Sequence, residues 1–410
     1  MLFLYDLGIR AYYFFVLIAA LKNKKARAWI EGRKNILRRI DRQIINTNQR
    51  AWFHFASLGE FEQGRPVLEG FKSQHPDVSI VITFFSPSGY EIRKDYPLAD
   101  HVFYLPLDTR RNAREFVRLI NPSIAIFTKY EYWYHYFRAL QEKNIPLFIV
   151  SGIFREDQTF FKWYGSLHRK MLKMVSYFFV QNDLSKKLLN NLGLENVAVA
   201  GDTRFDRVIK NKSQASDISA VKDFCDGKVF IAGSSWPEDE VLIAELAKQF
   251  SDWKFIIVPH EIHPEHMNAI ERLFPNSVKF SNIKNSTTNK QVIIIDNIGM
   301  LSNLYQYADI AYIGGGFGAG IHNTLEAAAF GIPVIFGPNY KKFQEAIDLI
   351  EIGAAFSIKT REELLKRLHD IEDKNLRDEM GEKAQTYVAG KAGATKIILD
   401  YLDKGRFLKP

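Results

Sequence analysis

The chain has 410 residues, a formal net charge of +8 and a single cysteine, Cys225. This length exceeds that of a typical single domain and suits two domains of ordinary size. One cysteine excludes an internal disulfide and a cysteine-built zinc site, which is typical of a protein in a reducing compartment. We therefore expect a protein of the cytoplasm or of the membrane face that borders it.

The positive charge is concentrated at the N-terminus. Residues 1–42 hold ten Lys or Arg and three Asp or Glu, so they carry +7 of the net +8. A basic face spread over the whole fold, as in many nucleic-acid-binding proteins, is therefore excluded, and no nucleic acid is expected as a partner. A local cluster of Lys and Arg indicates contact with an anionic membrane surface instead.

Residues 2–21, LFLYDLGIRAYYFFVLIAAL, precede most of these charges and are apolar and aromatic. Asp6 and Arg10 interrupt them, and a bilayer-spanning helix needs about 20 mostly apolar residues. The two side chains are four residues apart and can pair on one helix face, which leaves a span open, but an interfacial helix is favoured. The positive charges follow the apolar run, unlike those of a cleaved signal peptide, so the positive-inside rule keeps the body of the chain in the cytoplasm.

From Arg50 onwards, short apolar strands alternate with amphipathic helices. This alternation is typical of parallel sheets covered on both faces, so we predict an α/β protein with two doubly wound, Rossmann-like domains facing across a cleft, behind an N-terminal membrane-associated helix. The expected parts are an apolar and basic anchor at 1–42, a first domain at 43–209, a linker at 210–226 and a second domain at 227–410. Packing of the last helix against the first domain is left open. The predicted strands are 51–56, 78–84, 101–105, 124–128, 146–150, 177–180, 229–233, 254–259, 292–295, 310–313 and 333–336.

Residues 310–340, IAYIGGGFGAGIHNTLEAAAFGIPVIFGPNY, predict a strand, a glycine loop, a helix and a second strand. Glycines let the backbone approach a ligand closely, and the helix directs its partly positive N-terminus at the same point, so an anion such as a nucleotide phosphate fits there. Asn323 and Glu326 have the spacing of a capping-box variant, which is the purely structural alternative. The glycine spacing matches neither the dinucleotide fingerprint nor the P-loop.

The block GGGFGAGIHNTLEAAAFGIPVIFGPN resembles the nucleotide-sugar motif of the Kdo transferases, which attach 3-deoxy-D-manno-octulosonic acid (Kdo) to the lipid A precursor of lipopolysaccharide. Other segments resemble the motifs of this family in the same order, over roughly residues 50–400. They are SLGE at 57–60, TKYEYWYH at 128–135, GDTRFD at 201–206, AGSSWPEDE at 232–240, VPHEIHPEH at 258–266 and DNIGML at 296–301. The resemblance implies a glycosyltransferase of the B-type (GT-B) fold.

In the first domain, the resemblance assigns the general base to Glu60, next to Gly59. Its structural alternative is compensation of a helix dipole. Glu131 aligns with a family carboxylate that either binds the acceptor or supports its loop. Arg204 stands where the family usually has lysine, with a structural salt bridge as the alternative.

In the second domain, the resemblance implies donor-binding roles for a set of small, polar and imidazole side chains. His260 occupies a family arginine position and meets an anion less strongly than arginine does. The nearby histidines match no standard zinc spacing, so no metal is expected. The implied donor-binding residues are Ser234, Ser235, His260, Gly299, Gly315, Gly316, Asn323 and Glu326.

Taken together, the resemblance implies inverting transfer of Kdo from CMP-Kdo to a lipid A precursor, lipid IVA, without a cofactor, at the cytoplasmic face of the inner membrane of a Gram-negative bacterium. No D-x-D spacing occurs in the chain, so a metal-chelating A-type glycosyltransferase site is not expected. Three alternatives remain open: a transferase with a UDP-sugar donor, a nucleotide-sugar epimerase, and a membrane scaffold that only retains the fold.

Overall fold

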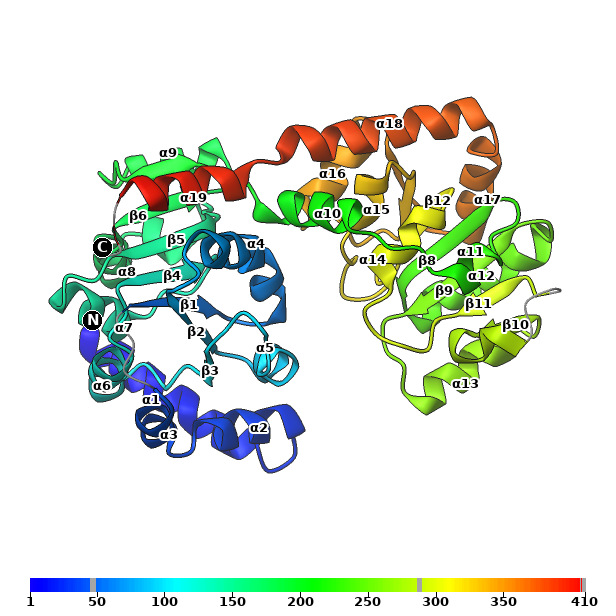
Figure 1. Ribbon diagram of the computed structural model, residues 1–410. Helices are drawn as coiled ribbons and strands as arrows, with labels where there is room; N and C mark the ends of the chain where they lie inside the picture. Colours follow the sequence, from blue (N-terminus) through cyan, green and yellow to red (C-terminus); the bar gives the residue numbers. More distant parts are fainter. Residues whose placement is uncertain (45–48, 286–289, 406, 408–410) are drawn as a thin grey trace. The chain divides into compact units, whose positions relative to one another are not determined.

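The computed structural model describes residues 1–44, 49–285, 290–405 and 407. The chain divides into two compact units (Figure 1). Unit 1 comprises Met1–Arg207 and Ala392–Pro410, and unit 2 comprises Val208–Lys391. Each unit is described by itself.

Unit 1 is built on a seven-stranded parallel sheet with the order β3-β2-β1-β4-β5-β6-β7. Its register is fixed at the centre, where Ala51 of β1 pairs with Ile80 on one side and Ile124 on the other. The strands are β1 (Arg50–Phe55), β2 (Ser79–Phe84), β3 (His101–Tyr104), β4 (Ile124–Thr128), β5 (Leu147–Gly152), β6 (Tyr177–Val180) and β7 (Val197–Val199).

Helices cover both faces of this sheet, as expected for strands that are apolar on both sides. Successive residues of β1 serve opposite cores: Trp52 packs with Phe116, and Phe53 packs with Phe71. The helices of unit 1 after β1 are α4 (Leu58–Gln74), α5 (Pro87–Arg93), α6 (Arg110–Ile120), α7 (Tyr134–Glu142), α8 (Ser166–Leu172) and α9 (Asp183–Asn190), with the 3-10 turn η1 (Thr159–Phe161).

Three helices precede the sheet: α1 (Leu2–Ala19), α2 (Lys24–Arg33) and α3 (Ile36–Gln43). Helix α1 has no buried residue. Among the described helices, it is the only one that is long and apolar enough to cross a membrane, and signal sequences share this length and composition. Helices α2 and α3 instead bury Trp29, Ile36 and Ile40 in unit 1. The expected boundary at residue 42 therefore differs from the structure, in which only α1 stands apart from the core.

The pairing of Asp6 with Arg10 that the sequence allows is not what the structure shows. Asp6 Oδ1 lies 2.6 Å from His135 Nε2 of α7, and the neighbouring Tyr5 hydroxyl donates to Asp108. Both partners are more than one hundred positions away in the sequence. One face of α1 is thus held on unit 1.

The chain passes from unit 1 to unit 2 within α10 (Thr203–Ser213) and returns before α19 (Ala394–Lys404). Asp206 accepts hydrogen bonds from the backbone N–H groups of Gly393 at 2.6 Å and Thr395 at 2.7 Å. In Figure 1, α19 (red) lies over the unit 1 sheet beside α4. The predicted linker at 210–226 differs from the structure, because it contains the end of α10 and all of α11 (Ser219–Lys222) and belongs to unit 2.

Unit 2 repeats the architecture with a seven-stranded parallel sheet of order β10-β11-β9-β8-β12-β13-β14. Its strands are β8 (Val229–Ser235), β9 (Lys254–Pro259), β10 (Ser277–Lys279), β11 (Val292–Ile294), β12 (Ile310–Ile313), β13 (Val334–Phe336) and β14 (Ala355–Ser357). Its remaining helices are α12 (Pro237–Gln249), α13 (Pro264–Leu273), α14 (Leu301–Leu304), α15 (Leu325–Phe330), α16 (Gln344–Glu351), α17 (Arg361–Asp370) and α18 (Lys374–Lys391), with the 3-10 turns η2 (Phe280–Asn285) and η4 (Tyr305–Tyr307).

The prediction of two doubly wound α/β domains is confirmed, and all eleven predicted strands are present. The sequence reading missed β7, β10 and β14. Each has only three residues and forms the edge of its sheet, so its apolar run is too short to predict a strand.

Candidate functional site

The predicted motifs follow the carboxyl ends of strands, and several of them lie beside a reversal of strand order, where ligands bind in doubly wound sheets. In unit 1 the order reverses between β1 and β4, and in unit 2 between β8 and β12. In unit 1, Glu60 lies in the first turn of α4, after β1, and Glu131 lies in the loop after β4. In unit 2, Ser234 lies at the end of β8, and the glycine run follows β12.

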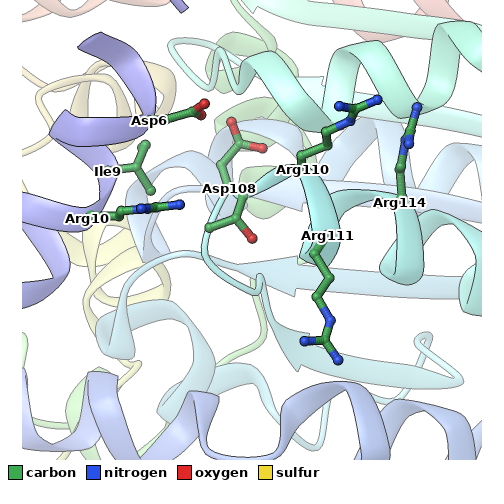
Figure 2. Close-up of a pocket in the computed structure, with 8 residues that line it drawn as sticks. Asp6, Ile9, Arg10, Asp108, Arg110, Arg111 and Arg114 are labelled. Atoms are coloured by element: carbon green, nitrogen blue, oxygen red, sulfur yellow. The ribbon is translucent and has the colours of Figure 1, made fainter. Parts of the chain in front are cut away.

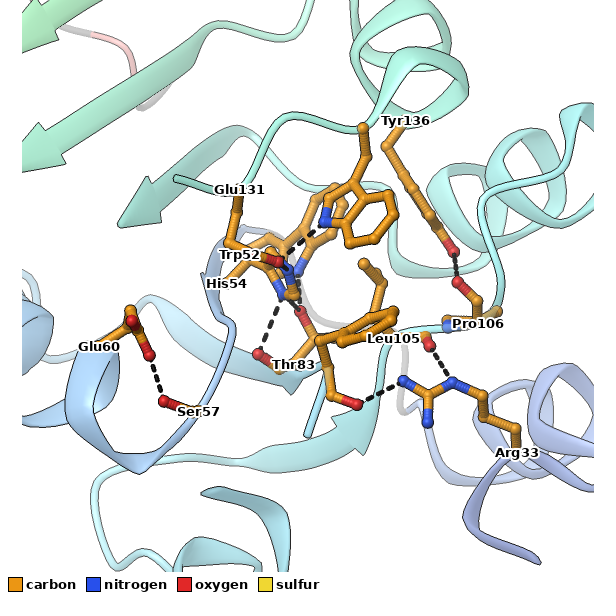
Figure 3. A network of polar contacts seen from close by, with 12 residues as sticks. Arg33, Trp52, His54, Ser57, Glu60, Thr83, Leu105, Pro106, Glu131 and Tyr136 are labelled. Carbon is orange, nitrogen blue, oxygen red and sulfur yellow. Dashed lines mark hydrogen bonds and ion pairs between the residues drawn. The ribbon is translucent and has the colours of Figure 1, made fainter. Parts of the chain in front are cut away.

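Glu60 lies in the first turn of α4, half-buried and directly after β1. The hydroxyl of Ser57, the residue before the helix, donates a hydrogen bond to Glu60 Oε2 (Figure 3). Gly59 between them is exposed. The carboxylate is thus held by a local contact at the carboxyl edge of the sheet.

Glu131 is held by two side chains (Figure 3). Its Oε2 lies 2.9 Å from His54 Nε2 and accepts a 2.9 Å hydrogen bond from Trp133 Nε1. His54 is fully buried at the end of β1, and its Nδ1 lies 2.8 Å from Thr83 Oγ1. Of the two roles left open for Glu131, this geometry favours support of the loop after β4. His54 was missed, although a histidine within an otherwise apolar strand was a visible signal.

Arg204 forms the salt bridge that was its structural alternative. Its Nη2 lies 2.8 Å from Asp202 Oδ2, and Asp202 is only 7% exposed. Asp202 Oδ1 also accepts a 2.8 Å hydrogen bond from Gln63 of α4. The GDTRFD segment therefore fixes α4, the helix that carries Glu60.

In unit 2, three aromatic rings from three different loops stack at the carboxyl edge of the sheet. The ring centroids of Trp236 and His260 are 5.0 Å apart with an interplanar angle of 25°, and those of His260 and His322 are 4.3 Å apart at 28°. Trp236 Nε1 donates to His322 Nε2 at 3.0 Å. Burial, and then the nearby His260, lower the pKa of His322 to about 4, so this imidazole is neutral and accepts the indole N–H. A flat ring of a ligand can extend such a stack.

The buried carboxylate of Asp239 organises the glycine loop. It accepts hydrogen bonds from the N–H of Gly315 at 2.9 Å, the N–H of Trp236 at 3.0 Å and the hydroxyl of Tyr312 at 2.6 Å. Gly315 has φ of +88°, which favours glycine. A Cβ on Gly316 would lie 2.6 Å from the backbone of Gly337, so only glycine fits there.

The other predicted donor-binding residues differ in exposure and in their hydrogen-bond partners. Ser234 has φ of +52° and is half-buried, whereas the Ser235 hydroxyl is buried and donates to Glu240 at 2.9 Å. Asn323 Nδ2 donates to Glu326 Oε1 at 3.2 Å, as the structural alternative for this pair expected. Gly299 lies exposed in the loop after β11.

The helices expected to direct their N-termini at the ligand are short. Helix α15 has six residues and begins after Thr324 instead of Asn323, and α14 has four residues. Aligned peptide dipoles sum over several turns, so the glycine backbone and the ring stack are the stronger candidates for ligand contact. Among residues 1–44, 49–285, 290–405 and 407, no group of three or more His, Cys, Asp or Glu side chains is arranged to hold a metal ion.

Residues 31–207 match the family model of 3-deoxy-D-manno-octulosonic-acid transferase (kdotransferase). The 3-deoxy-D-manno-octulosonic acid transferase of Haemophilus influenzae is 28% identical over 376 residues, which cover 86% of each chain. The resemblance to the Kdo transferases is confirmed. The bifunctional glycosyltransferase/methyltransferase of Fusobacterium nucleatum is also 28% identical, over 80% of this chain but only 53% of its own length.

Among solved structures, UDP-GlcNAc 2-epimerase from Neisseria meningitidis has a TM-score of 0.62 with 17% identity, covering 87% of this chain and all of that chain. At this identity the likeness shows the fold alone. The Kdo transferase relatives support glycosyltransferase activity, and the expected GT-B fold class is confirmed.

Proposed function

We propose that the protein transfers Kdo from CMP-Kdo to the lipid A precursor lipid IVA, with inversion at the anomeric carbon. The observation that carries the proposal is the match to Kdo transferases over most of the chain, which includes the segment that bears Glu60. An epimerase has the same fold, but the sequence relatives favour transfer.

In this proposal, Glu60 takes the proton of the acceptor hydroxyl as that oxygen attacks the anomeric carbon. Its place in the first turn of α4, where the Ser57 hydroxyl donates to it and the side chain is half-buried, supports this role. Glu131, held by His54 and Trp133, keeps the adjacent loop after β4 in position. Arg204 acts through Asp202 and α4, and we assign it a positioning role.

The donor lies, in this proposal, on unit 2 at the carboxyl ends of β8 and β12. Backbone N–H groups near Gly315 and Gly316 and the hydroxyl of Ser234 meet the phosphate, because such groups in a glycine loop form an anion-binding concavity. The rings of His260 and Trp236 meet the base or the sugar. We assign Asn323 and Glu326 to the ribose hydroxyls, since a carboxylate accepts two hydrogen bonds.

We further propose that the protein works at the cytoplasmic face of the inner membrane of a Gram-negative bacterium. Helix α1 supports this location, because one of its faces is held on unit 1 while the other is apolar and exposed. An apolar helix face that is parallel to a folded surface suits an interfacial position better than a span.

The test is to incubate the purified full-length protein with CMP-Kdo and lipid IVA and to detect products by mass spectrometry. The expected product is lipid IVA with added Kdo and released CMP. Incubation with UDP-GlcNAc, followed by analysis of the free sugar, tests the epimerase alternative. Absence of Kdo transfer together with epimerised product would overturn the proposal.

A further inference from the structure

Three adjoining pockets form a continuous groove on unit 1, between α1, the α2–α3 turn and the first half of α6. Their volumes are about 530, 760 and 570 Å³, and Arg111 lines all three. Figure 2 shows the first pocket, with Asp6, Ile9 and Arg10 on α1 opposite the arginines of α6. The other two continue past Arg38 of α3. We call this set of pockets the basic groove.

In the first pocket of the basic groove, the cations outnumber the carboxylates that line it. The other two pockets also carry carboxylates, namely Glu31, Asp41 and Glu115. In the part of the chain that the structure describes, Arg10, Arg110 and Arg111 form no ion pair, and all three side chains are exposed. Arg114 pairs with Glu142 at 3.1 Å, outside the first pocket. Four guanidinium groups from two helices therefore line one pocket of about 530 Å³.

The two carboxylates of this pocket are already engaged. Asp6 bonds to His135 at 2.6 Å. Asp108 is buried and accepts from the Tyr5 hydroxyl and, at 3.1 Å each, from the backbone N–H groups of His135 and Tyr136. These carboxylates hold α1 and α7 in place, which leaves the arginines as the available groups.

The basic groove runs beside the apolar face of α1. This face presents Leu4, Leu7, Phe14, Phe15 and Ile18, which are 51 to 66% exposed. Their spacing places them on one side of the helix, opposite Tyr5 and Asp6. If this side enters the hydrocarbon boundary, the flanking arginines lie at the depth of the lipid head groups.

We infer that the basic groove binds the phosphate group of a membrane lipid. Guanidinium groups bind phosphate oxygens in pairs, and an apolar helix alongside provides a surface for the acyl chains. The phosphate belongs either to an ordinary anionic phospholipid or to a phosphorylated glycolipid such as the proposed acceptor. The inference builds on the proposed membrane location and is independent of the sugar donor.

The test measures flotation of the full-length protein with vesicles of three compositions: phosphatidylcholine alone, phosphatidylcholine with phosphatidylglycerol, and phosphatidylcholine with a few per cent of a phosphorylated glucosamine lipid. The variant is Arg110→Gln with Arg111→Gln. The matched control is Lys170→Gln with Lys173→Gln, which removes the same charge from exposed positions at the C-terminal end of α8, outside all three pockets. Circular dichroism checks that both variants are folded.

Each cation near an anionic surface contributes about fivefold in affinity, so we expect the groove variant to bind phosphate-bearing vesicles roughly 30-fold more weakly. The control should stay within about fivefold of wild type. Weaker binding of the groove variant to vesicles with phosphatidylglycerol identifies a phospholipid as the source of the phosphate. Weaker binding only to vesicles with the glycolipid identifies the proposed acceptor as the source. Equal losses in variant and control, or none in the groove variant, would overturn the inference. Kdo transfer is assayed separately, so either result leaves the proposed function to its own test.

Discussion

Replacement of Asp239 tests whether one carboxylate holds the candidate donor loop. The side chain is 1% exposed and accepts three hydrogen bonds, from the N–H groups of Trp236 and Gly315 and from the Tyr312 hydroxyl. Asp239→Ala leaves all three donors without this acceptor. Each unsatisfied buried donor costs about 1 to 3 kcal/mol, so the free energy of unfolding should fall by at least about 3 kcal/mol. For a unit of this size, that lowers the melting temperature by roughly 6 to 12 °C.

Asp239→Asn removes the charge of this side chain but keeps its capacity to form the three hydrogen bonds. The amide oxygen still accepts the two backbone N–H groups, and the amide nitrogen donates to a rotated Tyr312 hydroxyl. Burial raises the pKa of Asp239, so the neutral amide also avoids the desolvation of a carboxylate. We therefore expect a loss of about 1 kcal/mol or less.

Calorimetric unfolding and titration with CMP measure both effects, with Glu238→Ala at the neighbouring exposed position as control. The alanine variant should bind CMP much more weakly, because the Gly315 loop and the ring of Trp236 lose a shared anchor. A melting temperature within about 2 °C of wild type, with normal CMP affinity, would refute the reasoning.

Four further outcomes are expected. Glu60→Gln should lower turnover by roughly 10² to 10⁴ with donor affinity little changed, whereas a role limited to the helix dipole would cost only about 0.3 to 1 kcal/mol of stability and leave turnover intact. Deletion of residues 1–21 should shift the protein to the soluble fraction, and unchanged retention after a salt wash would contradict the anchor. Turnover should persist in excess EDTA, and its loss with recovery on adding magnesium or zinc would show a metal requirement. Folding lowers the pKa of His322 from 6.5 to about 4, so the free energy of unfolding should fall as the pH drops from 6.5 towards 4. The loss at pH 5 should be about 1 to 2 kcal/mol after solvent screening. Denaturant unfolding of His322→Gln at the same pH values should lack this loss.

The sequence predicted the layered fold well because buried parallel strands are short apolar runs that local composition reveals. The sequence did not predict contacts between residues that are far apart along the chain. Asp6 could pair with Arg10, four residues away, but folding brings it to His135 instead. The boundary at residue 42 failed for a similar reason, since Ile36 and Ile40 enter the core beside Phe116 of α6.

The candidate site shows the same limit. Glu60 and Gly315 were singled out because they follow predicted strands and lie in segments that resemble the family motifs. Asp239 and His322 were missed as functional supports, because their roles depend on loops from different strands meeting at the sheet edge. A glutamate or aspartate after a strand does not reveal by itself whether it contacts a ligand or holds a loop.

Helix α1 also contacts side chains that lead to the loop after β4. The ring of Tyr12 lies 6.0 Å from that of Phe85, and Phe85 stacks on Trp133 at 5.0 Å. Trp133 in turn bonds to Glu131 in the loop after β4. Deleting α1 therefore disturbs this loop as well as membrane binding, so a loss of turnover would have two causes. Replacing the outward-facing Phe14 and Phe15 with serine keeps the Tyr12 contact and removes apolar surface alone. If the apolar face of α1 binds the membrane, this double variant should lose membrane retention and keep its turnover on detergent-solubilised acceptor.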